Sequence, residues 1–142
     1  MHTILSVAKE LAIKHSDDPD TQVGVFFMDP KRNEPLAFGC NRIPDNIKKT
    51  AERLKRPTKY AFIEHAERHA IYWAGRFNIP LEGSVVYSTL FPCCDCARAI
   101  IQAGCIGIVS QKPDESMPRW SEQMKIAKTM FEEAGVKVTL ID

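Results

Sequence analysis

The sequence predicts an α/β protein with three layers, in which a five-stranded mixed sheet carries helices on both faces. Apolar residues repeat at helical spacing in four segments and form short runs bounded by turn formers in five others. The order is helix, strand, strand, helix, strand, helix, strand, helix, strand. Because a helix links the fourth and fifth strands, we expect these two strands to be parallel. Residues 1–142 are expected to form one domain.

The N-terminal half opens with an amphipathic helix over residues 3–15. Residues 16–20 break it with turn formers and a proline. Two strands follow at residues 23–28 and 36–40, and their short polar link predicts an antiparallel hairpin. Residues 41–62 form the least regular part and include a basic run of six cations. These cations are Lys48, Lys49, Arg53, Lys55, Arg56 and Lys59.

The second half alternates between helix and strand. We expect helices to begin at His65, at Cys93 and after an N-cap at Ser121. Gly135 is placed to end the last helix. Strands are expected over residues 85–89, 106–109 and 136–140.

Two motifs have the residue types and the positions of a zinc site. His65 and Glu67 form an H-x-E triplet, and Cys93 and Cys96 form a C-x-x-C pair directly after Pro92. Thiolate and imidazole suit zinc, and three protein ligands leave a fourth position for water, as in catalytic sites. Each motif falls at a helix start, where the partial positive charge favours thiolate over thiol. The sequence therefore predicts a Zn²⁺ site held by one histidine and two cysteines.

Glu67 is the candidate catalytic residue, because it lies two positions from His65 and does not need to bind the metal. A carboxylate there can take a proton from water, pass it to a ring nitrogen and protonate leaving ammonia. The H-x-E and P-C-x-x-C motifs together are a known signature of zinc-dependent nucleobase deaminases. Two alternatives are a structural zinc site completed by Cys94, His69 or Cys40, and a core histidine without metal.

Composition limits the cellular setting and the partners. The five cysteines are odd in number and three are clustered, which favours a reducing compartment over a disulfide framework. Cys40 and Cys105 are expected to be buried, and Cys94 to be a bystander. No apolar run approaches the roughly 20 residues that span a bilayer, and no signal peptide is evident. We therefore expect a cytoplasmic protein that does not bind membranes.

The cations of residues 41–62 allow two interpretations. Such a run is usually a solvated surface, but some of these side chains could instead contact the phosphates of a nucleotide. The net charge is +1, so the chain has no strong field for nucleic acid. A deaminase of tRNA or of single strands is therefore the weaker alternative, and tight, salt-sensitive RNA binding would support it. A zinc-stabilised binding module without catalysis is a third interpretation.

The chain resembles the deoxycytidylate (dCMP) deaminases of the cytidine deaminase superfamily. The resemblance rests on residues 65–67 (HAE), residues 89–104 (TLFPCCDCARAIIQAG), Lys59-Tyr60 and residues 81–83 (LEG), and it extends over residues 3–140. It implies a cytidine-deaminase-like fold and hydrolysis of dCMP to dUMP and ammonia for pyrimidine deoxynucleotide metabolism. It also implies a homo-oligomer, commonly a hexamer, with dCTP as activator and dTTP as inhibitor.

The resemblance also assigns substrate contacts. Val23 matches the apolar residue that packs on the pyrimidine, and Asn41 matches the asparagine that binds the sugar hydroxyl. The Ala66 backbone would contact the base edge, and Phe91 would close the pocket beside the sugar.

The sequence departs from the family pattern at two places. Residues 39–42 are Gly-Cys-Asn-Arg in place of Gly-Tyr-Asn-Gly, in a loop that helps form the regulatory nucleotide site of the family. His69 replaces an asparagine near the active site, which leaves a 5-substituted dCMP open as substrate; alternatively, it makes only a local hydrogen bond. Trp73 and Arg76 are either a core aromatic and a surface cation or part of a subunit interface.

Overall fold

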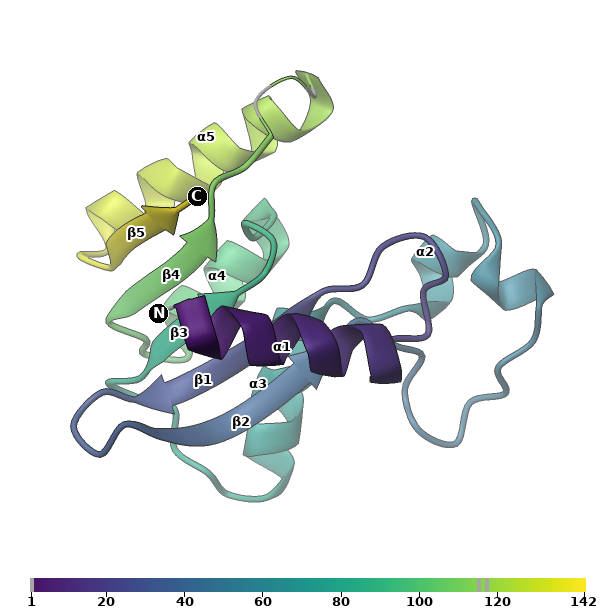
Figure 1. The fold of residues 1–142 in the computed structure, drawn as a ribbon, viewed down its shortest axis with the longest axis horizontal. Helices are drawn as coiled ribbons and strands as arrows, with labels where there is room; N and C mark the ends of the chain where they lie inside the picture. The colour runs from purple at the N-terminus through teal and green to yellow at the C-terminus, as the bar shows by residue number, and fades with distance from the viewer. Residues whose placement is uncertain (1, 115, 117) are drawn as a thin grey trace.

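The computed structural model describes residues 2–114, 116 and 118–142 and shows one five-stranded sheet (Figure 1). The spatial order of the strands is β2-β1-β3-β4-β5. Strand β1 is antiparallel to both β2 and β3, whereas β3, β4 and β5 run parallel. The predicted mixed sheet, hairpin and parallel fourth and fifth strands are therefore confirmed. The strands are β1 (Gly24–Asp29), β2 (Glu34–Cys40), β3 (Val85–Ser88), β4 (Gly107–Gln111) and β5 (Lys137–Ile141).

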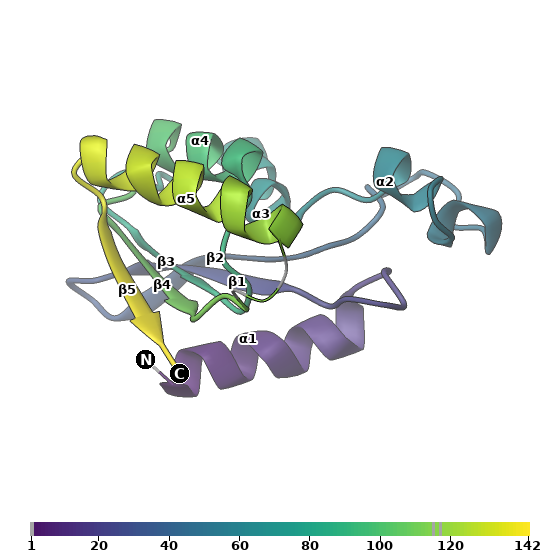
Figure 2. The same ribbon diagram turned by 90° about the horizontal axis from the view of Figure 1, so that it is seen from above.

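Helices cover both faces of the sheet, as predicted. Figure 2 shows α1 on one face and α3, α4 and α5 together on the other. Helices α3 and α4 bring the two parts of the zinc motif to the same side of the sheet. The helices are α1 (His2–His15), α2 (Lys59–Phe62), α3 (Ala66–Arg76), α4 (Cys94–Gln102) and α5 (Pro118–Glu133), with a short 3₁₀ helix η1 (Glu52–Leu54).

The core lies between the sheet and these three helices. Phe27, Val86 and Ile108 project from three neighbouring strands and are fully buried. Ala70 and Ala74 are among the buried positions of α3, and small side chains there let the helix approach the sheet closely. In the described part of the chain, no helix is long and apolar enough to cross a membrane.

The last helix differs from the expectation. It begins at Pro118, so the prediction of an N-cap at Ser121 is wrong. Proline is well suited to the first turn of a helix, because the N–H that it lacks has no partner inside the helix there. Gly135 does follow the helix with a φ of 75°, the left-handed conformation expected of a terminating glycine.

Residues 41–62 extend from the body of the molecule beyond the C-terminal end of β2, on the side away from the β1–β2 turn (Figure 1). The segment contains η1 and α2 but no strand. It is anchored at both ends, since Arg42 and Glu64 pair backbone to backbone in an antiparallel bridge. The bridge places the residue after Asn41 beside the residue before His65.

Candidate metal and active site

The starts of α3 and α4 bring His65, Cys93 and Cys96 together. His65 and Cys93 are the N-cap residues of these helices, and Cys96 lies in the first turn of α4. His65 Nδ1 is 3.6 Å from Cys93 Sγ and 3.5 Å from Cys96 Sγ, and the three ligand atoms lie within 4.8 Å of one another. Tetrahedral zinc with usual bond lengths separates a bound nitrogen and sulfur by about 3.6 Å. The three residues therefore fit a zinc ion.

The site favours a negative charge on sulfur. A hydrogen bond from Cys96, together with the His65 ring, lowers the pKa of Cys93 to about 4, despite partial burial. The neighbouring Cys93 and burial raise the pKa of Cys96. The hydrogen bond with Cys93 also raises the pKa of His65. The cluster therefore favours a thiolate on Cys93, which is the form in which cysteine binds a metal cation.

Glu67 lies in the first turn of α3 beside this cluster, and its side chain is buried. Burial raises the pKa of its carboxyl, against the effects of its own backbone N–H and of the His65 charge. A carboxyl with a raised pKa can both accept and return a proton near neutral pH. The position therefore suits general acid–base chemistry next to the three ligand residues.

The loop of residues 16–23, between α1 and β1, is fastened to Asn41. Asn41 Oδ1 accepts a hydrogen bond from Val23 N (2.8 Å) and lies 2.7 Å from Ser16 Oγ. Asn41 Nδ2 donates to Thr21 O at 2.7 Å. Two residues with predicted substrate contacts, Val23 and Asn41, are thus directly bonded, and both are buried with 8% exposure.

The other two predicted contacts flank the zinc motif. Ala66 is the first residue of α3 and is buried. Phe91 lies two residues before Cys93, and it packs edge-on against Phe131 with ring centroids 6.2 Å apart. Both therefore lie within two residues of a candidate metal ligand, and Phe91 also belongs to the core.

The remaining cysteines lie apart from the three ligand atoms. The Cys94 thiol donates to Gln123 O on α5 at 3.3 Å, which agrees with its predicted role as a bystander. Cys40 and Cys105 are buried, as expected. Burial raises the pKa of both thiols, and they therefore remain neutral.

His69 and Trp73 line a hollow of about 490 Å³ beside the edge strand β2. Cys40 and Arg42, from the segment that departs from the family pattern, line it as well. Within the described residues, the His69 ring has no hydrogen bond, which does not support the local bond considered above. Trp73 is 41% exposed and packs on Phe77, so its interpretation as a core aromatic is wrong.

The cations of residues 41–62 are not one solvated face. Lys59 is buried and bonds to Asp18 and Asp20, and Lys49 pairs with Asp17 at 3.2 Å. Sequence reasoning assigned no individual role to Lys59. The aspartates of residues 17–20 were the available signal, because a cluster of acidic residues can neutralise a basic segment elsewhere in the chain.

Comparison with known proteins agrees with this site. The chain matches the family model of the cytidine and deoxycytidylate deaminase zinc-binding region over residues 1–111. An uncharacterized deaminase in the luxG 3′ region of Aliivibrio fischeri is 37% identical over 131 residues, which cover 92% of this chain and 86% of that protein. The deoxycytidylate deaminases of Mus musculus and Homo sapiens are each 33% identical over 135 residues, 89% of this chain and 71% of theirs. The chain belongs to the cytidine and deoxycytidylate deaminase family.

Solved structures share the fold. The dCMP deaminase of cyanophage S-TIM5, in complex with dCMP and dUMP, has a TM-score of 0.76 at 22% identity and covers 99% of this chain and 95% of its own. A deaminase/reductase of Thermotoga maritima has a TM-score of 0.66 at 24% identity and covers 97% of this chain and 35% of its own. Fold, family and the metal-binding cluster together define a zinc-dependent hydrolase of the deaminase class.

Proposed function

We propose that the protein hydrolyses dCMP to dUMP and ammonia in pyrimidine deoxynucleotide metabolism, and that residues 1–142 act as one zinc-dependent deaminase domain. The observation that carries the proposal is the buried carboxyl of Glu67 beside His65, Cys93 and Cys96. The identity to mouse and human deoxycytidylate deaminases supports dCMP as the substrate.

His65, Cys93 and Cys96 would hold the metal through Nδ1 and the two Sγ atoms. Zinc bound there would supply Lewis acidity, which lowers the pKa of water to about 7 in such sites. Glu67 then takes one water proton and delivers it to the ring nitrogen beside the amino-bearing carbon. Water oxygen bonds to that carbon, Glu67 transfers the remaining proton of the new hydroxyl to the amino group, and the C–N bond breaks to release ammonia and leave a carbonyl.

The substrate contacts follow the resemblance. Val23 packs on the pyrimidine, Asn41 donates a hydrogen bond to the sugar hydroxyl, the Ala66 backbone binds the base edge and Phe91 lies beside the sugar. The direct bond between Val23 N and Asn41 Oδ1 supports this assignment, because it makes the base and sugar contacts one unit.

The test is ammonia release by purified, zinc-loaded protein. We expect selective turnover of dCMP when it is offered in parallel with 5-methyl-dCMP, deoxycytidine, CMP, dCTP and RNA. Preferred turnover of 5-methyl-dCMP would favour a 5-substituted substrate, and deamination of RNA alone would replace the proposal with an RNA-editing activity. No turnover of any monomer contradicts it.

Three further features belong to the proposal. We expect a cytoplasmic homo-oligomer, commonly a hexamer in this family, and the exposed rings of Tyr72, Trp73 and Phe77 at the end of α3 support a protein–protein contact. Sedimentation measures the oligomeric state.

We expect dCTP to activate and dTTP to inhibit only if the altered segment at Cys40 and Arg42 still accepts a nucleotide. The ammonia-release assay, repeated with each effector, tests this.

A further inference from the structure

Lys59 is a buried cation with two carboxylate partners. Its side chain is 2% exposed, and Nζ bonds to Asp18 Oδ1 (3.0 Å), Asp18 Oδ2 (3.2 Å) and Asp20 Oδ2 (2.8 Å). A buried ammonium is tolerated only when it is paired and hydrogen-bonded in this way. Burial alone would lower the pKa of Lys59, but the two carboxylates outweigh it and raise the pKa. Lys59 is therefore charged and fixed.

The partner Asp18 shapes the 16–23 loop from inside. Its Oδ1 accepts hydrogen bonds from the backbone N–H of Asp20 (2.9 Å) and of Thr21 (3.3 Å). Its backbone carbonyl accepts a bond from Gln22 Nε2 at 2.8 Å. Lys59 therefore binds the same carboxylate that accepts the backbone hydrogen bonds of this turn.

The 16–23 loop ends at Val23 and is bonded to Asn41, and both residues have proposed substrate contacts. Thr21 and Val23 both bond to the Asn41 side chain, so the loop lies between Lys59 at one side and Asn41 at the other. On the other side, Lys59 opens α2, and the chain from α2 runs through Glu64, which is bridged to Arg42, into His65. One ammonium therefore couples the loop to the segment that enters the zinc site.

We propose that Lys59 is a positioning residue that holds the 16–23 loop in the conformation needed for substrate binding. The inference rests on the proposed function, because it takes the loop to contact dCMP. Lys59 itself does not touch the reacting atoms. Its loss weakens binding while the metal site and Glu67 keep their arrangement, so the effect falls on KM rather than on kcat.

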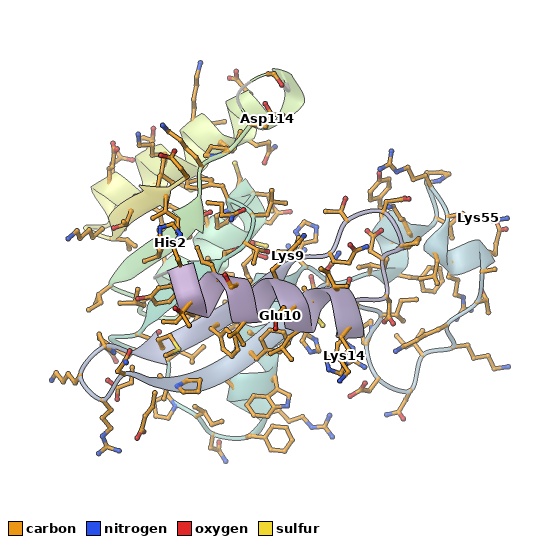
Figure 3. All side chains as sticks on the ribbon, in the orientation of Figure 1. His2, Lys9, Glu10, Lys14, Lys55 and Asp114 are labelled. Atoms are coloured by element: carbon orange, nitrogen blue, oxygen red, sulfur yellow. The ribbon has the colours of Figure 1, made fainter. Side chains whose placement is uncertain are left out.

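The test compares Lys59→Met with Lys55→Met. Lys55 lies on the same protruding segment, and Figure 3 shows its side chain directed away from the rest of the protein. We expect Lys59→Met to raise KM for dCMP about tenfold or more and to change kcat less than about threefold. Zinc content stays at that of the wild type, and amide hydrogen exchange speeds up in residues 20–23. Lys55→Met behaves as wild type in all four measurements.

Asp20→Asn is the milder variant, because Asp20 is half-exposed and its loss leaves the bonds between Lys59 and Asp18. Asp20→Asn should give a KM for dCMP and a rate of amide hydrogen exchange between those of the wild type and Lys59→Met. If Lys59→Met does not fold, Asp20→Asn serves as the test of the proposal. Unchanged KM and exchange in the folded variants overturn the proposal, as does a fall in kcat alone or a loss of zinc. If the wild type does not deaminate dCMP, the proposed function is wrong, but the role of Lys59 can still be tested by hydrogen exchange. Exchange in residues 20–23 at the wild-type rate in the variants would then overturn the proposal that Lys59 holds the loop.

Discussion

Gly39 lies where β2 packs against α3, the helix that carries Glu67, and leaves no room for a side chain. A Cβ at this position would lie 2.2 Å from Ala66 O and 2.9 Å from both Cβ and N of Ala70, whereas real Cβ contacts below 3.0 Å essentially never occur. In Gly39→Ala, the first turn of α3 must therefore move away from β2 by roughly 1 Å, at a cost of about 3 kcal/mol for overpacking against backbone.

This shift has two measurable consequences. The loss of stability corresponds to a fall in Tm of roughly 10 °C for a chain of this size, measured by calorimetry. Because the same turn carries Glu67, a misplacement of roughly 1 Å lowers kcat/KM for dCMP by about 100-fold. Initial rates at a temperature where the variant is folded separate the second effect from the first.

The control is Gly75→Ala, the same substitution near the end of α3. A Cβ at Gly75 meets no atom within 4 Å. Alanine there should stabilise the helix by about 0.5–1 kcal/mol and leave kcat/KM unchanged. Wild-type Tm and activity in Gly39→Ala would refute the packing argument, and a large loss in Gly75→Ala would show that α3 tolerates no added methyl group.

Three further predictions concern single groups. Glu67→Gln keeps zinc but lowers kcat by about 10²- to 10⁴-fold, because the proton carrier is lost; metal analysis and initial rates check this, and full turnover contradicts it. Cys93→Ser loses zinc to a chelator that the wild type resists, whereas Cys94→Ser retains it, and equal retention in both argues against the assigned ligands. The hydrogen bond and the charge of Lys59 lower the pKa of Asp20 below its ordinary value of 3.8. The ionised carboxylate therefore stabilises the folded state above pH 3.8. This stabilisation is lost as the pH falls through the lowered pKa of the folded protein. The stability difference between wild type and Lys59→Met, measured by urea unfolding, should therefore shrink below pH 3.8, and a constant difference would count against the pairing.

Local sequence patterns were sufficient to predict the topology of the sheet and the cluster of candidate metal ligands. The link between β1 and β2 is too short for anything but an antiparallel hairpin, and the helices after β3 and β4 impose parallel neighbours. The candidate ligands could be grouped because both motifs stand at helix starts, and parallel packing of such units brings helix starts to one edge of the sheet.

Pairing over long sequence distances was not predictable in the same way. Lys59 is separated from Asp18 and Asp20 by 41 and 39 positions, and nothing local distinguishes it from the other cations of the basic run at residues 48–59. Only the folded chain shows which cation is buried. The start of α5 was missed for a different reason. Ser121 is a good N-cap by type, but Pro118 is equally suited to the first turn of a helix, and local pattern does not decide between them.

Asn41 shows how the structure changes the meaning of a residue that the resemblance had already assigned. An amide side chain has two acceptor sites and two donors. Val23 N and Ser16 Oγ approach Oδ1, and Thr21 O takes one of the two N–H donors. One N–H is therefore left for a sugar hydroxyl, and its direction is fixed by the loop. A side chain fixed in this way loses little conformational entropy when the substrate binds. If Asn41 binds the sugar hydroxyl as proposed, recognition of the sugar depends on the order of the 16–23 loop, which is the property that we propose Lys59 maintains from the opposite side.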